Sequence, residues 1–277
     1  RSQAANRAAG FLFGVLSGMP QYVWSQSHAY HHKTNGDWDR YRGALSTLTT
    51  AEYDALDAGK RKLYRRSRHI ALAPFGGFIY LVFNPRFNWI RGQLQWLWQR
   101  LRHAGRGVVH KPSRYWKNAR EYRHQTANNL VLLSLWALVW PLPGVFFATY
   151  IVALSVAGGV GIALFTVQHN FEDSYASGTA DWDADAGCLE GTSFLVLPEW
   201  LNWVTANIGY HHVHHLSSAI PGYRIRECHD RNAQLFEGVR RIHLWEVPAQ
   251  LKCILWDRDA GRIVSIVDHD LRRQIGA

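Results

Sequence analysis

The sequence predicts an all-α integral-membrane protein with a transmembrane helical hairpin and a histidine-rich helical cap on the cytoplasmic side. Three observations lead to this prediction: an uncharged, mostly apolar run over residues 129–167, a basic aromatic segment before it, and two clusters of closely spaced histidines. The mean hydropathy of −0.22 is typical of a soluble chain. An average over 277 residues nevertheless conceals so concentrated a run.

Composition excludes two broad classes of protein. With 47% hydrophobic and 13% aromatic residues, the chain can offset the entropy of ordering, so it is not intrinsically disordered. Its three cysteines lack CxxC or zinc-like spacing, which argues against a disulfide-stapled secreted module. Nucleic-acid binding is a rival explanation of the net charge of +10, but no nucleic-acid motif accompanies the basic residues. We therefore expect no nucleic-acid partner.

Two apolar stretches before the hairpin are short or interrupted. Residues 11–24 contain two glycines and Pro20, so whether they enter the membrane stays open. Residues 70–83 are broken by Pro74 and are shorter than the ~20 residues that a helix needs to cross the hydrocarbon core. We expect both stretches to be interfacial or buried pieces.

Residues 86–103 have the pattern of an amphipathic helix. Apolar residues recur at helical spacing, with tryptophans and arginines around them, and this pattern is typical of a helix that lies in a bilayer interface. Basic residues continue to Arg123, and an excess of them near a span places that end in the cytoplasm. The periodic residues are Ile90, Leu94, Leu97 and Leu101.

The run over residues 129–167 predicts two membrane spans joined by a turn. It is long enough for about two helices that cross the bilayer, and Pro141, Pro143 and Gly144 fall where a turn would separate them. A single long helix buried in a soluble protein is the alternative. A hairpin returns the chain to the side it left, so residues 168–277 would form a cytoplasmic segment.

Histidines occur at the spacing of metal ligands. Residues 28–32 and 211–215 each contain HxxHH, which places three imidazoles on one helical face, and His169 follows the second predicted span. Neutral imidazole suits iron, zinc and copper, and a structural zinc site is disfavoured because no cysteine takes part. A solvated surface cluster is the alternative. The predicted ligands are His28, His31, His32, His169, His211, His214 and His215.

Other polar residues are candidates to orient these ligands through hydrogen bonds to their second ring nitrogen. Metal-bound imidazoles usually donate their second N–H to a carboxylate, a carbonyl or water. His212 falls on another helical face of its box, and Asn207 shares the face of His211. The alternative for His212 is a role as a ligand itself. Asn207 could instead be an ordinary interfacial polar residue, and the carboxylates could be ordinary solvated surface groups. The candidates are Asn207, His212, Asp37, Asp39, Glu172 and Asp173.

Three segments resemble the histidine boxes of the membrane fatty acid desaturase family. Residues 207–223, with HHVHH and the sequel LSSAIPGY, resemble its third box, residues 168–173 the histidine-bearing exit of its last span, and residues 28–37 its second box. Within the family, the sequence looks most like acyl-lipid desaturases of the Δ12 (omega-6) type. The resemblance implies a single desaturase domain over residues 1–277.

The resemblance also implies an activity with its cofactors and partners. We expect an O2-dependent desaturase in which two non-haem irons, held by the seven histidines, act on a long acyl chain in the bilayer. Electrons would come from an acidic ferredoxin- or cytochrome-type donor that docks on the basic cytoplasmic face, although anionic headgroups explain that charge equally well. The alternatives are a related hydroxylase or ketolase of alkanes or carotenoids, and a non-catalytic membrane metal-binding protein.

One family feature has no counterpart in the sequence. The first box, usually HDxxH, should stand upstream of the second, yet residues 1–27 contain no histidine. We expect an N-terminally truncated chain that does not complete its metal centre as written, and we assign the expected activity to the full-length form.

Overall fold

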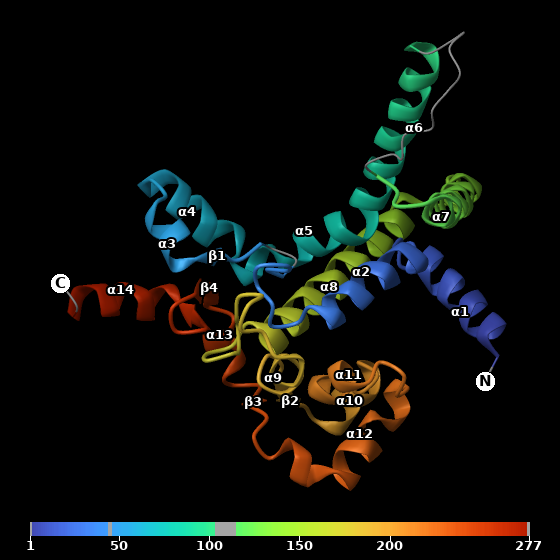
Figure 1. Ribbon diagram of the computed structural model, residues 1–277. Helices are drawn as coiled ribbons and strands as arrows, with labels where there is room; N and C mark the ends of the chain where they lie inside the picture. Colours follow the sequence, from blue (N-terminus) through green and yellow to red (C-terminus); the bar gives the residue numbers. More distant parts are fainter. Residues whose placement is uncertain (1, 44–45, 103–114, 276–277) are drawn as a thin grey trace. The chain divides into compact units, whose positions relative to one another are not determined.

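The computed structural model describes residues 2–43, 46–102 and 115–275 (Figure 1). The chain forms two compact units, of which the first comprises Arg1–Ala29 and Leu72–Gly161 and the second Tyr30–Ala71 and Ile162–Ala277. The described residues are mostly helical, as predicted. Two small sheets in the second unit correct the all-α prediction.

Helices alone make up the described part of the first unit. Two of them, α2 and α8, continue into the second unit. The turn between α7 and α8 lies at Pro141 and Pro143, as predicted, and the rings of Trp140 and Phe147 meet beside it with centroids 5.8 Å apart. The helices are α1 (Gln3–Leu16), α2 (Gln21–Lys33), α5 (Ala73–Phe78), the π-helical η2 (Ile79–Phe83), α6 (Asn84–Arg102), α7 (Ala119–Val139) and α8 (Gly144–His169).

Two helical segments of the described chain are long and apolar enough to cross a membrane. They are α8 and Ile70–Arg102, in which the short η1 (Ile70–Leu72), α5, η2 and α6 follow one another without a break. Residues 70–83 therefore belong to a longer helical segment than the sequence analysis expected, and their interfacial or buried position stays a prediction. Pro74 lies in the first turn of α5, where its missing N–H removes no helical hydrogen bond. The two spans predicted within residues 129–167 stay a prediction, because α7 carries polar residues in its first half.

Arg86 repairs the break that Pro85 makes in the second of these segments. Proline leaves a carbonyl of the preceding turn without its donor. The Arg86 guanidinium donates to the carbonyls of Leu81 and Val82, at 3.2 and 2.8 Å, and to the carbonyl of Gly18 between α1 and α2. The predicted interfacial helix over residues 86–103 is thus the second half of a longer helical segment. Residue 103 and the basic residues 106–114 lie outside the described residues.

Helix α7 has an inverted polarity. The residues that it buries against its neighbours are mainly polar, whereas several leucines are exposed. Gln125 and Asn129 donate to the carbonyl of Pro85, and Asn128 accepts from Arg86. This pattern is typical of a helix whose outer solvent is hydrocarbon. The buried residues are Glu121, Gln125, Asn128, Asn129 and Leu132, and the exposed leucines include Leu130, Leu133, Leu135 and Leu138.

Helix α5 touches α8 through glycine backbones. A Cβ atom added at Gly77 would lie 2.3 Å from the carbonyl carbon of Gly158, and one at Gly159 would lie 2.8 Å from the nitrogen of Pro74. Such distances exclude any side chain. Small residues bring membrane helices together in this way, because without water between helices close packing provides much of the attraction.

The second unit combines short helices with two small sheets. In one sheet β1 pairs in parallel with β4, which pairs antiparallel with β5; in the other, β2 pairs in parallel with β3. The helices are α3 (Thr50–Asp54), α4 (Ala58–Ser67), α9 (Ala184–Leu189), α10 (Glu199–Val204), α11 (His211–Leu216), α12 (Gly222–Arg231), η3 (Ala233–Phe236), α13 (Val247–Gln250) and α14 (Ile266–Ile275). The strands are β1 (Leu48–Thr49), β2 (Phe194–Val196), β3 (Arg241–His243), β4 (Cys253–Asp257) and β5 (Arg262–Ser265).

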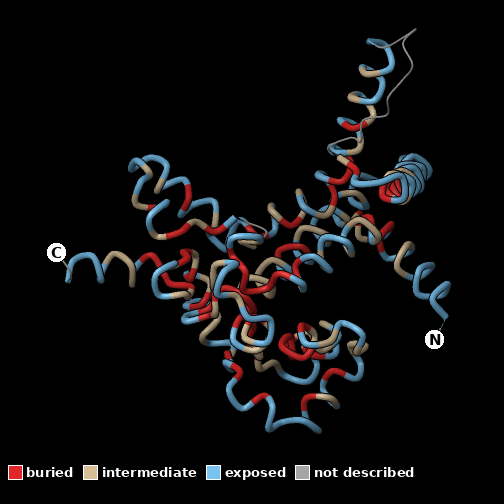
Figure 2. Tube along the Cα trace, viewed as in Figure 1, coloured by how far each residue is buried: buried red, intermediate tan, exposed pale blue. Residues whose placement is uncertain are grey.

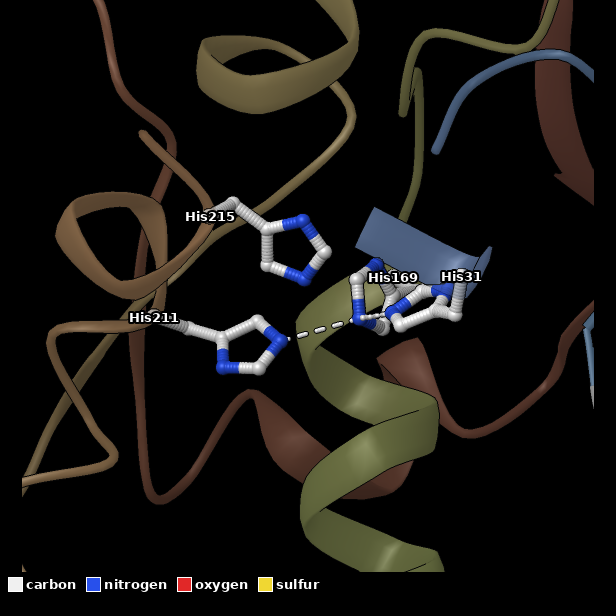
Figure 3. A group of neighbouring side chains, drawn as sticks. All are labelled: His31, His169, His211 and His215. Carbon is white, nitrogen blue, oxygen red and sulfur yellow. Dashed lines mark hydrogen bonds between the residues drawn. The ribbon is translucent and has the colours of Figure 1, made fainter. Parts of the chain in front are cut away.

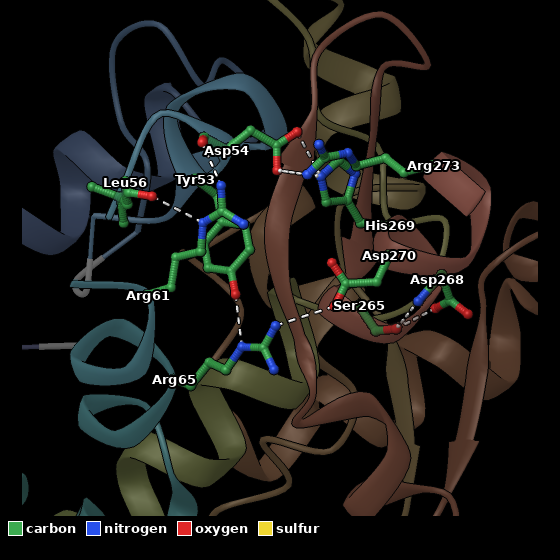
Figure 4. A network of polar contacts seen from close by, with 10 residues as sticks. All are labelled: Tyr53, Asp54, Leu56, Arg61, Arg65, Ser265, Asp268, His269, Asp270 and Arg273. Carbon is green, nitrogen blue, oxygen red and sulfur yellow. Dashed lines mark hydrogen bonds and ion pairs between the residues drawn. The ribbon is translucent and has the colours of Figure 1, made fainter. Parts of the chain in front are cut away.

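Buried residues of this unit gather on the β1–β4–β5 sheet and around the end of α8 (Figure 2). A polar network outside the sheet fastens α14 to α3 and α4 (Figure 4). The Asp54 carboxylate lies 3.1 Å from Nε2 of His269 and accepts from Arg273 at 2.8 Å. Arg65 donates to the hydroxyl of the fully buried Tyr53 at 2.6 Å. The C-terminal helix is therefore part of the folded unit.

Candidate metal centre

The two HxxHH boxes lie on helices, as their spacing predicts. The first forms the last turns of α2, which ends at Lys33. The second forms nearly all of α11, a helix of six residues. His169 is the last residue of α8. Three elements far apart in the sequence thus supply the predicted ligands.

Four of these histidines converge within the second unit (Figure 3). All four are buried, and one nitrogen from each lies within 4.8 Å of the others. The Nε2 atom of His169 is 2.9 Å from that of His211 and 3.1 Å from that of His31. Two nitrogens that bind one ion at about 2.1 Å and at right angles lie about 3.0 Å apart. The arrangement of His31, His169, His211 and His215 therefore fits a common metal ion.

The protonation of the cluster also fits a metal ion. Burial, reinforced by the neighbouring histidines, holds the pKa values of His211 and His215 well below the ordinary value. Neutral imidazole is the form that binds metal. Both ring nitrogens of His215 are buried without a hydrogen-bond partner, which is unfavourable unless another group binds them. A metal ion could accept a lone pair from each of these imidazoles.

A second pair of box histidines lies against this cluster. The Nε2 atoms of His32 and His214 are 3.1 Å apart. The ring of His32 stacks on that of His215, with centroids 4.2 Å apart and planes 9° apart, and burial lowers the pKa of His32. His28 lies one turn before His32 on α2, with its ring stacked on Trp24 at 4.5 Å. The seven predicted ligands thus include four in one buried cluster and two in an adjoining pair.

Aromatic side chains enclose one side of the cluster. The ring of Phe165, one turn before His169 on α8, lies 4.7 Å from the His169 ring and 5.2 Å from the His31 ring. The Tyr41 ring also lies 5.2 Å from His31. The sequence did not single out either residue, because aromatic residues are common in a chain of this composition. The spacing of Phe165 four residues before His169 was the available signal.

The carboxylates predicted to support the ligands have other partners. Asp37 accepts from the Thr179 hydroxyl at 2.9 Å and pairs with Arg40. Asp39 pairs with Arg258 at 3.1 Å. Asp173 pairs with Arg262, and Glu172 is exposed. Their support of the metal ligands stays a prediction.

His212 and Asn207 support α11 from its other side. Nε2 of His212 lies 2.8 Å from Nδ1 of His229 on α12, away from the four-histidine cluster. Burial lowers the pKa of His212 to about 3, so the pair is neutral near pH 7. Asn207, with a left-handed φ of 60°, donates to the carbonyl of Gly222 at the start of α12. Both contacts tie the box to its surroundings.

Sequence reasoning missed Gly191 and Asn35. Nδ1 of His169 lies 3.3 Å from the carbonyl oxygen of Gly191, so a backbone carbonyl occupies the place expected for a carboxylate. The side chain of Asn35 donates to the same carbonyl at 3.3 Å. A backbone oxygen carries no signal in the sequence. Asn35, four residues after His31, was within reach of inference.

Comparisons with known proteins identify the family of the chain. A family model described as fatty acid desaturase matches residues 1–246. A fatty acid desaturase of Bacillus subtilis is 33% identical over 263 residues, covering 94% of this chain and 68% of the relative. The chain belongs to the fatty acid desaturase family. It is therefore an oxidoreductase that desaturates fatty acyl chains.

A second relative of this desaturase carries a more specific name. The sn-1 oleoyl-lipid 12-desaturase of Synechocystis sp. is 30% identical over 157 residues, covering 50% of this chain and 44% of the relative. The family match of the desaturase ends before α13. Strands β4 and β5 lie beyond it, yet they pair with segments that flank the histidine boxes.

Proposed function

We propose that the full-length protein is an O2-dependent di-iron acyl-lipid desaturase that introduces a double bond into a long acyl chain at the Δ12 position. The observation that carries the di-iron part is the four-histidine cluster, in which buried imidazoles from α2, α8 and α11 lie close enough together to bind one ion. The name of the Synechocystis relative supports the Δ12 position over half of the chain.

The histidines divide into two groups, which suits two ions. His31, His169, His211 and His215 would hold the first. His32 and His214, joined by His28 from the same face of α2, would hold the second. The stacked rings of His32 and His215 connect the groups. Supplementary ligands would come from the family's first box in the full-length form.

The chain's own residues keep the site dry and neutral. Phe165 and Tyr41 cover the cluster, and burial disfavours protonation of the ligands, which would expel a metal ion. Bound iron would supply the O2 chemistry that breaks unactivated C–H bonds, which side-chain acids and bases cannot perform. Overall, an adjacent pair of methylenes loses two hydrogens, while O2 takes these, two electrons and two protons to form two waters.

We place the histidines on the cytoplasmic side of the membrane. The basic residues around α6 and α7 support this orientation. An acidic ferredoxin- or cytochrome-type protein would supply the electrons at that face. The acyl substrate would come from the bilayer, which the two candidate spans and the exposed leucines of α7 allow the protein to enter.

Expression of the full-length protein in a host that lacks polyunsaturated fatty acids tests this proposal. We expect about two irons per chain and a new double bond at the Δ12 position, both lost in His215→Ala. The matched control is His243→Ala, because His243 lies on β3, stacked on Trp245, and is not a proposed ligand. Hydroxylated or keto products would instead make the protein a hydroxylase or ketolase. Zinc, or no metal and no product, would refute the di-iron proposal.

A further inference from the structure

His169 is the last residue of α8, and contacts on the side away from the other histidines orient its ring. The hydroxyl of Ser174 donates to the His169 carbonyl at 2.8 Å, which fixes the backbone. Nδ1 of the ring faces the carbonyl of Gly191. A carbonyl oxygen only accepts hydrogen bonds, so this contact requires the proton on Nδ1. Nε2 then carries the lone pair toward His31 and His211.

Asn35 holds that carbonyl in place. Its buried side-chain nitrogen donates to the carbonyls of both Gly187 and Gly191. The backbone carbonyl of Asn35 accepts from the indole nitrogen of Trp182 at 2.8 Å. The Gly191 carbonyl thus receives two hydrogen bonds, one from Asn35 and one from His169. The loop after α9 is connected through Asn35 to the end of the second box.

Gly187 in α9 and Gly191 in the loop after it are both required as glycines. A Cβ atom at Gly187 would lie 2.3 Å from the Asn35 carbonyl oxygen, and one at Gly191 would lie 2.6 Å from the Gly187 carbonyl oxygen. The amide of Gly191 donates to Ala186 at 3.0 Å, which closes the loop on the helix. The backbone can therefore approach Asn35 closely only without these side chains.

We infer that Asn35 is a positioning residue for His169: it fixes the Gly191 carbonyl, which holds the His169 ring in the Nδ1–H form with the Nε2 lone pair directed toward His31 and His211. The metal-binding part rests on the proposed function. The ring's tautomer does not, since it follows from contacts that need no ion. Supporting partners of this kind typically change metal affinity by about 10–100-fold.

The first experiment measures the tautomer in metal-free protein. Nitrogen NMR of the protein with ¹⁵N-labelled histidine, assigned with His169→Gln, should show a protonated Nδ1 for His169. Asn35→Asp, of the same shape but without the donor, should shift the ring toward a mixture of tautomers. Asn232→Asp is the matched control, because Asn232 donates to a carbonyl at the exposed end of α12. A proton on Nε2 in the unaltered protein overturns the inference, even if no variant folds.

The second experiment measures Fe(II) binding by the full-length protein. Asn35→Asp should bind one of two irons about 10–100-fold more weakly and alter the Mössbauer signal of that iron alone. Gly191→Ala should do the same, with Asn35 intact. Unchanged affinity, or equal loss at both irons, refutes the positioning role. An unaltered protein that binds no iron but keeps the Nδ1–H tautomer refutes the proposed function and leaves the positioning of the ring standing.

Discussion

The burial of His215, a proposed metal ligand, is energetically unfavourable when no metal ion is bound. The residue is 5% exposed, and neither ring nitrogen has a hydrogen-bond partner. A buried polar group without a partner costs about 1–3 kcal/mol, more than an ordinary hydrogen bond contributes. The folded chain therefore carries this cost in its metal-free form, and metal binding would remove it.

Replacement of His215 should separate metal binding from stability. We expect His215→Leu, which fills most of the same space without polar atoms, to make the metal-free protein about 1–3 kcal/mol more stable. It should also bind iron at least roughly 10-fold more weakly, because a ligand is lost. Thermal unfolding in one detergent and iron titration measure the two effects. A metal-free variant less stable than the unaltered protein would contradict the first expectation.

The thiol of Cys253 should react slowly with alkylating reagents. Burial, together with nearby carboxylates, raises the pKa of Cys253 to about 12. The thiolate is the reactive form, and its fraction for Cys253 at pH 8 is roughly 1,000-fold or more below that of a free thiol. A more basic thiolate is also a better nucleophile, so we expect Cys253 to be alkylated roughly 100-fold more slowly. Mass spectrometry after timed iodoacetamide treatment measures the rate. Free cysteine treated in the same way serves as the reference thiol. If Cys253 in the folded protein reacted as fast as free cysteine, its thiol would be accessible and ionised.

At the scale of elements, two short helices are joined by a pair of histidines. His212 of α11 and His229 of α12 share a proton between Nε2 and Nδ1, and the His229 ring stacks on Phe236 at 5.3 Å. Neutral rings suit this buried place, and burial lowers the pKa of His229 as well. The spacing of the third box predicted that His212 points away from the other histidines, but it gave no indication of its partner.

The stability that this pair provides should depend on pH. The folded pKa of His212, about 3, lies below the unfolded value of about 6.5, so its contribution is complete above pH 6.5 and is lost as the pH falls toward 3. Between pH 6 and 4, His212→Gln should lower the slope of unfolding free energy against pH by about 1.4 kcal/mol per unit. Urea unfolding of the metal-free protein at a series of pH values measures the slope. Identical slopes would mean that His212 titrates normally.

The contact between α5 and α8 is also specific to position. A Cβ atom at Gly158 would lie 2.7 Å from Cα of Gly77, and backbone atoms cannot yield as a flexible side chain can. We expect Gly158→Leu to destabilise the protein by about 1–3 kcal/mol or more. Gly161→Leu, on the same helix, is the control, because a Cβ atom there meets nothing within 4 Å. Equal thermal unfolding of the two variants would exclude a tight helix crossing.

At the scale of the whole molecule, histidine spacing predicted much of the site. HxxHH placed each box on a helical face, and the requirement that the chain return to one side of the membrane grouped His169 with both boxes. The strands were beyond such reasoning, because short apolar runs such as residues 253–257 fit a strand or a helix equally well. Pro74 was read as a break because the position of a proline within a helix, which decides its effect, depends on where the helix begins.

The segments that carry the ligands are connected by the C-terminal hairpin of β4 and β5. Trp256 of β4 is fully buried, packs on Trp38 with centroids 6.1 Å apart, and donates to the carbonyl of Ala176 at 3.1 Å. Trp38 follows the second box and Ala176 follows His169. Trp256 therefore contacts both approaches to the metal centre, from a position beyond the matched family range.

Substitution of Trp256 should affect the whole unit. We expect Trp256→Ala to destabilise the protein by about 3–5 kcal/mol and to abolish iron binding, because a large cavity separates the two segments. Trp256→Phe keeps most of the packing and should lose only about 1 kcal/mol with the hydrogen bond. Trp245→Ala, at a residue that is 77% exposed, is the control. Full iron binding by Trp256→Ala would separate the hairpin from the centre.

The inverted polarity of α7 predicts that the stability of the first unit depends on the surrounding lipid. In the bilayer position that we propose for α7, its buried amides are shielded from hydrocarbon, whereas urea acts on proteins whose apolar core is shielded from water. Its exposed leucines have no reason to associate with one another until lipid is withdrawn. We therefore expect removal of lipid during purification to destabilise this helix, and retained phospholipid to stabilise it. A lipid count per chain would therefore complement thermal unfolding as a measure of the integrity of this unit.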